Sequence, residues 1–184
     1  MAEASGPVGP FPDGVDPVEY DRLRRRVLWA MPTGLYVVGS VAGGERNLMT
    51  ANLVVQLCVD PKLVGVAVES SARTHGLIES GGCFAVSFVA RDDRALVRKF
   101  VKPATDDRAA RTLNGVAYLD APVTGAPVLA GAVAFLDCRL ERTVALGSHS
   151  LFVGLVVDAA FGAGRDPEEG PVLRVEDTRM SYGG

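Results

Sequence analysis

The fold of this chain is decided by the stretch RNLMTANLVVQLCVDPKLVGVAV, which spans residues 46–68. Its first part, to about Val59, is apolar and rich in residues that favour extended backbone, and Asp60-Pro61 is typical of a turn. A second, valine-rich strand is predicted over Lys62–Val68. The stretch therefore predicts strands joined by a tight turn.

Strand patterns also dominate outside this stretch. Strands are predicted at 35–41, 83–89, 132–144, 150–161 and 172–175, and helices at 70–80 and 91–101, with a polar loop at 102–114. The helices are too few for the regular strand–helix alternation of a doubly wound sheet. We therefore expect a mostly β fold: an antiparallel barrel, closed or half-closed, with short helices.

One further helix is predicted before the first strand. Asp16 is a good N-cap, Pro17 suits the first helical position and Glu19 completes a capping box. Pro32 ends the helix. Its apolar residues recur at helical spacing: Tyr20, Leu23, Val27 and Ala30.

Length and composition indicate one domain. The chain has 184 residues, of which 48% are hydrophobic and 22% charged, and its net charge is −3. We expect a flexible, Pro/Gly-rich N-terminal arm at 1–15 and a single domain at 16–184. The acidic balance argues against a protein that grips the nucleic-acid backbone.

The same composition predicts a cytoplasmic location. No run of about 18 apolar residues occurs, so we expect no membrane span, and the N-terminus lacks the pattern of a secretory signal. Cys58, Cys83 and Cys138 are far apart in apolar surroundings, so we expect them to be reduced core residues without a zinc site.

The segment Asn47–Leu53 carries polar residues within an apolar strand. Ala51 leaves room for a flat ring, so Met49, Thr50, Ala51, Asn52 and Leu53 could present main-chain groups to a heteroaromatic ligand. A half-buried strand with polar residues facing solvent explains the same pattern. The chain has neither a glycine-rich dinucleotide fingerprint nor a P-loop.

The segment Ser70–His75 combines hydroxyl groups and a cation at the start of a predicted helix. Ser71 is a natural N-cap, and the free N–H groups and dipole of a helix N-terminus favour an anion such as a phosphate. Ordinary capping beside a solvated Arg73 is the alternative.

His149 stands in Gly147-Ser148-His149-Ser150, where a loop meets a strand. An imidazole in a cleft could form hydrogen bonds or transfer protons near neutral pH. Residue type alone favours the alternative, a surface histidine without a role.

Taken in order, these segments resemble the flavin reductase-like family, which has an FMN-binding split barrel of the antiparallel, Greek-key type. The resemblance covers about residues 20–184. It rests on the motifs MPTG (31–34), LMTAN (48–52), DP (60–61), SSARTH (70–75), FAVS (84–87), TGAPVL (124–129), GSHSLFVG (147–154) and EDTRMSYGG (176–184).

The resemblance implies a homodimeric NAD(P)H:flavin oxidoreductase that reduces FMN or FAD and supplies the reduced flavin to a partner monooxygenase. It implies that Met49–Leu53 meet the flavin ring, that Ser70–Thr74, helped by Lys102, meet the phosphate, and that His149 lies where the nicotinamide docks. Thr33 and His75 fall within matched motifs and join the expected cofactor-binding residues.

At three positions the chain departs from the family: Ser148 replaces an acidic residue, Ser87 an asparagine and Leu155 a glutamate. Each replacement removes a polar group near the strand and loop that carry His149, which leaves two other hypotheses. One is a split-barrel flavoenzyme that retains FMN and acts on an organic substrate in a biosynthetic pathway. The other is a non-catalytic flavin or haem binder.

Overall fold

The computed structural model describes residues 6–163 and 172–178. Expectations that concern residues 1–5, 164–171 and 179–184, which include most of the loop at 162–170 and the end of the C-terminal motif, lie outside these ranges. The elements run in the order α1 (Pro17–Trp29), β1 (Tyr36–Ala42), β2 (Glu45–Ala51), β3 (Val54–Val59), β4 (Lys62–Glu69), α2 (Arg73–Gly81), β5 (Cys83–Phe88), η1 (Arg91–Asp93), η2 (Leu96–Phe100), β6 (Asp106–Asp107), β7 (Thr112–Leu113), β8 (Val116–Asp120), β9 (Pro127–Leu129), β10 (Ala134–Leu146), β11 (His149–Phe161) and η3 (Val175–Asp177).

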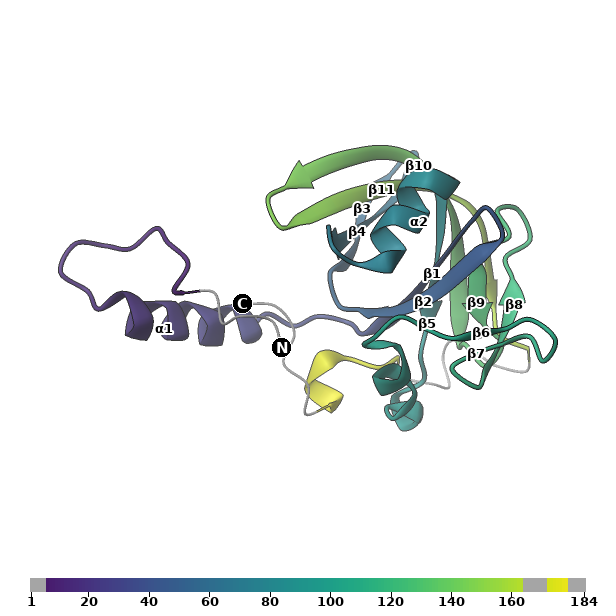
Figure 1. Cartoon of the computed structure of the whole chain (residues 1–184), viewed down its shortest axis with the longest axis horizontal. Helices are drawn as coiled ribbons and strands as arrows, with labels where there is room; N and C mark the ends of the chain where they lie inside the picture. Colours follow the sequence, from purple (N-terminus) through teal and green to yellow (C-terminus); the bar gives the residue numbers. More distant parts are fainter. Residues whose placement is uncertain (1–5, 164–171, 179–184) are drawn as a thin grey trace.

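Two antiparallel sheets form the body of the protein (Figure 1). The larger has the order β2-β1-β5-β10-β11-β4-β3, and the smaller has the order β6-β7-β8-β9. The expected mostly β fold with short helices is confirmed. In the described part of the chain the larger sheet is open, because its edge strands β2 and β3 do not pair with each other.

The two edges of the open sheet nevertheless lie close together. Only Asn52 and Leu53 separate the end of β2 from the start of β3. Since successive Cα atoms are about 3.8 Å apart, the edges come within roughly 11 Å of each other at this crossing. The sheet is therefore strongly curled, and the crossing segment lies at its mouth.

The core is divided between the inside of the curl and the space under the smaller sheet. Phe84, Phe152 and Ile78 of α2 are fully buried in the first cluster. Phe100 and Leu113 are fully buried in the second, which lies between β1, η2 and the smaller sheet. These clusters hold α2 and η2 on either side of β2.

Several expected elements differ in detail. The helix expected at 91–101 is two short 3₁₀ turns, η1 and η2, although Val97 and Phe100 point inward as expected. The loop expected at 102–114 contains the short strands β6 and β7, and β8 and β9 were not predicted. The strand expected at 172–175 consists of isolated bridges followed by η3.

The helix α1 begins as predicted but contacts little of the body. The Asp16 carboxylate accepts from the N–H groups of Val18 and Glu19, whereas the Glu19 carboxylate accepts from Arg22 instead of reaching back to the N-cap. None of its residues is buried. Figure 1 shows that it extends away from the sheets, and Leu23 and Val27 of its expected apolar face are exposed.

The three cysteines are free thiols, but only Cys83 and Cys138 are in the core. Burial and the neighbouring Asp137 charge raise the pKa of Cys138 to about 12. The expectation of a core position is wrong for Cys58, which is half-buried because β3 is an edge strand with one open face.

No helix in the described ranges has the length and apolar character needed to cross a membrane. Among the same residues, no three His, Cys, Asp or Glu side chains are grouped so that they could hold a metal ion.

Candidate functional site

A cavity of about 390 Å³ opens at the mouth of the curled sheet, where the chain crosses from β2 to β3. The end of β4, the first turn of α2 and the segment after η2 form its other walls. Its lining residues are Asn47, Met49, Thr50, Ala51, Asn52, Leu53, Ala67, Val68, Glu69, Ser71, Ala72, Arg73, Thr74, Phe100, Val101, Lys102, Pro103 and His149.

Most residues singled out from the sequence line this one cavity, although they come from distant parts of the chain. They are Met49, Thr50, Ala51, Asn52, Leu53, Ser71, Arg73, Thr74, Lys102 and His149. Thr33, Ser70 and His75 lie outside the lining. Thr33 lines a separate hollow between the end of α1 and η3, and the Ser70 N–H donates to the Ser148 carbonyl.

The helix α2 begins later than the sequence predicted. Ala72, with extended backbone, is the N-cap, and no side chain of the described residues caps the helix. The expected cap by Ser71 is therefore wrong, because Ser71 lies in the turn that precedes the cap. The His75 N–H donates to the Ala72 carbonyl oxygen, so without a capping side chain the N–H groups of Arg73 and Thr74 are the ones that stay available to a ligand at the cavity wall.

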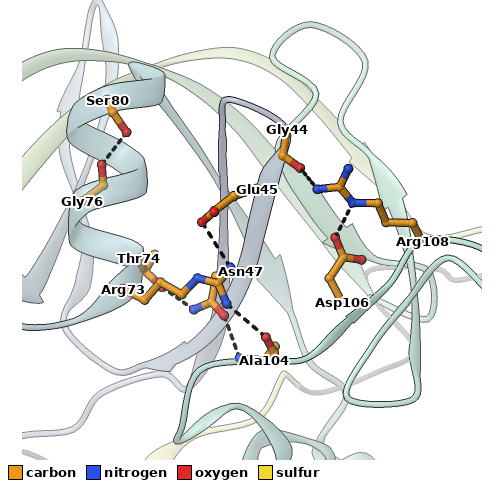
Figure 2. A network of polar contacts seen from close by, with 10 residues as sticks. All are labelled: Gly44, Glu45, Asn47, Arg73, Thr74, Gly76, Ser80, Ala104, Asp106 and Arg108. Carbon is orange, nitrogen blue, oxygen red and sulfur yellow. Dashed lines mark hydrogen bonds and ion pairs between the residues drawn. The ribbon is translucent and has the colours of Figure 1, made fainter.

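The Arg73 guanidinium is shared between two neighbours at the rim of the cavity (Figure 2). It forms an ion pair with Glu45 (3.3 Å) and donates to the Ala104 carbonyl oxygen (3.3 Å). Lys102, by contrast, is exposed and forms no ion pair within the described residues. Lys102 is thus the cation of the lining whose charge is not already shared with a carboxylate.

A buried network lies beneath this rim. The side-chain amide of Asn47 donates to Thr74 Oγ1 (2.8 Å), and its Oδ1 accepts from the Ala104 N–H (2.8 Å). Figure 2 shows these residues between β2, α2 and the segment before β6. Thr74 is 0% exposed, so its hydroxyl supports the wall and does not face the open cavity.

His149 begins β11 at the far rim. Gly147, at φ +74°, makes the tight turn that precedes it. The ring Nδ1 lies 2.9 Å from Ser148 Oγ, and the residue is opposite Glu69 in the β4–β11 register. In the described part of the chain Nε2 has no protein partner, so this nitrogen is free to contact a ligand.

His75 connects α2 to β11 underneath the cavity. Its Nε2 is 2.8 Å from Ser150 Oγ, its Nδ1 is 3.5 Å from a Glu79 carboxylate oxygen, and its ring meets Phe152 edge-on. The side chain is only 8% exposed. The structure therefore places His75 in the packing below the site.

The departures from the family pattern are not all near His149. Ser148 contacts His149 directly, but Ser87 is buried in β5, where its hydroxyl accepts from the Leu129 N–H (3.0 Å). Leu155 lies further along β11, opposite Leu63. The expectation that all three remove polar groups near the strand and loop that carry His149 is wrong for Ser87, because β10 separates β5 from β11, whereas Leu155 lies on β11 itself.

Sequence reasoning missed several lining residues, among them Asn47, Glu69 and Phe100. Asn47 was visible as a polar residue inside an apolar strand. No pattern in the sequence around Phe100 and Val101 indicates a cavity, because only the tertiary position of η2 brings these residues to it.

Comparisons with known proteins agree on one family. The profile described as "Flavin reductase like domain" matches residues 28–181. An NADH-dependent FAD reductase from Streptomyces globisporus is 34% identical over 155 residues, which cover 83% of this chain and 82% of that protein. The reductase component of 4-hydroxyphenylacetate 3-monooxygenase from Thermus thermophilus is 32% identical over 149 residues, 81% of this chain and 87% of that protein.

Solved structures give the same result. An NADH:FAD oxidoreductase from Streptomyces globisporus, in complex with NAD and FAD fragments, is similar with a TM-score of 0.69 and 33% identity. The match covers 88% of this chain and 92% of that one.

Proposed function

Because this chain belongs to the flavin reductase-like family, we propose that it uses NADH to reduce FMN or FAD and passes the reduced flavin to a partner monooxygenase. Two relatives are named as the reductase components of monooxygenases. The resemblance left NADH and NADPH open, and the relatives' names favour NADH.

One observation of the structure carries the proposal: an apolar strand, an uncapped helix N-terminus and a histidine with a free ring nitrogen share one cavity. Its volume of about 390 Å³ lies within the range of small-molecule sites. The residues present therefore fit a flat ring with a charged tail.

In this assignment the ring lies against Met49–Leu53, where the small Ala51 leaves the backbone accessible. Ser71, the first N–H groups of α2 and Lys102 hold the phosphate. Phe100 and Val101 keep water from this wall. When bound, the flavin supplies the redox chemistry by accepting two electrons and a proton from the nicotinamide.

His149 acts at the other rim. Ser148 Oγ holds its Nδ1, which leaves Nε2 to orient the nicotinamide carboxamide or to donate a proton to reduced flavin. The histidine contributes positioning and proton transfer and forms no covalent bond.

We further propose that the protein is a cytoplasmic homodimer. Exposed apolar side chains on α1 and β3 support the association of two copies. Leu23 and Val27 of α1 are 54% and 62% exposed, and Val55 and Val59 of the edge strand β3 are 56% and 71% exposed. Such apolar area is typical of an interface. Light scattering should give twice the chain mass of 19.3 kDa.

The proposed cytoplasmic location is supported by the three free thiols, which fit a reducing compartment.

The function is tested by an anaerobic titration. The protein is mixed with FMN or FAD, and NADH or NADPH is then added in separate experiments. Loss of the oxidised flavin absorbance band at a rate that depends on the protein is expected, with NADH the better donor. If neither nicotinamide reduces bound or added flavin, the proposal is wrong. A yellow protein that retains FMN through gel filtration but is inert to both donors would instead support an enzyme acting on an organic substrate.

A further inference from the structure

A single buried side chain joins two walls of the cavity. Asn47, which is 3% exposed, donates to Thr74 Oγ1 in the first turn of α2 and accepts from the Ala104 N–H just after Lys102. Both hydrogen bonds are 2.8 Å long. The N-terminus of α2 and the segment that carries Lys102 are therefore connected through this buried amide, in addition to the rim contact between Arg73 and the Ala104 carbonyl oxygen.

The segment around Ala104 is also held before and after this point. Thr50 Oγ1 donates to the Val97 carbonyl oxygen (2.5 Å), and the Arg108 guanidinium donates to the Gly44 carbonyl oxygen (2.7 Å). Figure 2 shows the second contact beside the turn between β1 and β2. The segment thus follows β2, and Asn47 provides the middle attachment, which is next to the cavity.

Residue type matters at this position. The two partners of Asn47 are an acceptor and a donor, and among side chains of this size only an amide supplies one group of each kind in its single protonation state. A carboxylate would lose the donor and add a negative charge beside an anion site. Leucine branches at the same carbon atom and would leave the buried Ala104 N–H without its side-chain partner.

We propose that Asn47 is a positioning residue for the flavin phosphate: its two buried hydrogen bonds fix the separation between the α2 N-terminus and Lys102. The inference rests on the proposed function, since it assumes that a phosphorylated flavin occupies the cavity. It concerns the discrimination between phosphorylated and unphosphorylated flavins, and it assigns no role in electron transfer.

The test compares the affinities of Asn47→Leu and wild-type protein for FMN and for riboflavin, measured by quenching of flavin fluorescence. Because the phosphate end alone is disturbed, the Kd for FMN should rise about tenfold while that for riboflavin changes by less than about twofold. Ser40→Ala is the matched control: it removes another fully buried hydrogen bond, from Ser40 Oγ to the Cys83 carbonyl, and should leave the ratio of the two Kd values unchanged.

Two further measurements test the proposal, and the first does not depend on the stability of Asn47→Leu. Thr74→Val should weaken the binding of FMN but not that of riboflavin. Thr74→Ser keeps the hydroxyl and should bind FMN as the wild type does. In the ligand-free protein, amide hydrogen exchange at Ala104 should be faster in Asn47→Leu than in wild type and unchanged in Ser40→Ala.

Equal losses of FMN and riboflavin affinity, or unchanged exchange at Ala104, would overturn the role of Asn47 while leaving the proposed function intact. A wild-type protein that binds neither flavin would remove both proposals.

Discussion

The two ends of the cavity are built differently. At the α2 end, buried side chains form a connected network, in which Asn47 and Thr74 are at most 3% exposed and each has a partner from another element. At the β11 end, His149 is half-buried, and within the described residues the one hydrogen bond of its ring is to its neighbour Ser148.

This difference separates binding from turnover. A network of satisfied buried hydrogen bonds is rigid, and a rigid wall lowers the cost of ordering a ligand's charged tail. A ring held by one neighbour can adjust to a second ligand that arrives and leaves in each cycle. We therefore expect substitutions at the α2 end to change flavin affinity and substitutions at the β11 end to change the rate of flavin reduction.

The largest expected effect is at His149. His149→Ala should slow the reduction of bound flavin by NADH about 100-fold, because positioning and proton transfer are lost, while flavin Kd stays within about twofold. Stopped-flow absorbance under anaerobic conditions measures the rate. Thr143→Ala, an exposed position of the same hairpin, serves as the control. Parallel losses of rate and affinity would erase the distinction between the two ends.

A smaller effect is expected at Lys102. Lys102→Ala should raise the Kd for FMN about fivefold at low salt and less at high salt, because the lost contact is a screened charge interaction, and riboflavin binding should not change. Lys99→Ala removes an equal charge from a neighbouring exposed residue that does not line the cavity. If both variants weaken the binding of FMN equally, the total charge of this region governs binding, and the position of Lys102 in the cavity wall does not.

The smallest effect is expected at Ser71. Ser71→Ala should raise the Kd for FMN about threefold, since one neutral hydrogen bond at an exposed site is lost. Calorimetry with FMN measures it. Ser80→Ala, which removes a hydroxyl at the other end of α2, should have no effect. A change in NADH turnover at saturating FMN in Ser71→Ala would show that the α2 end takes part in more than binding.

The sequence predicted those parts of the fold that have long, regular patterns. The strands that became β1, β4, β5, β10 and β11 and the start of α1 at Asp16 were visible because periodicity and capping are local properties. The short strands β8 and β9 were missed, since strands of this length carry too little alternation to be recognised. The N-cap of α2 was misplaced because Ser71 is a better capping residue than Ala72 on residue type alone.

The site was predictable as separate segments, and the contacts between them were not. Residue types marked Met49–Leu53 and His149, and the resemblance to a family gave them roles. Nothing near Asn47 in the sequence indicates that its amide meets Thr74 and Ala104, because these contacts depend on how α2 and the segment after η2 pack on β2. The open face of Cys58 is likewise a property of its strand's place at the sheet edge.

The most direct test of the account is a crystal structure of the protein with FMN at saturating concentration. The account predicts the ring against Met49–Leu53 and the phosphate between the α2 N-terminus and Lys102, with His149 on the opposite rim. FMN bound elsewhere, or in this cavity with its phosphate beside His149, would contradict it.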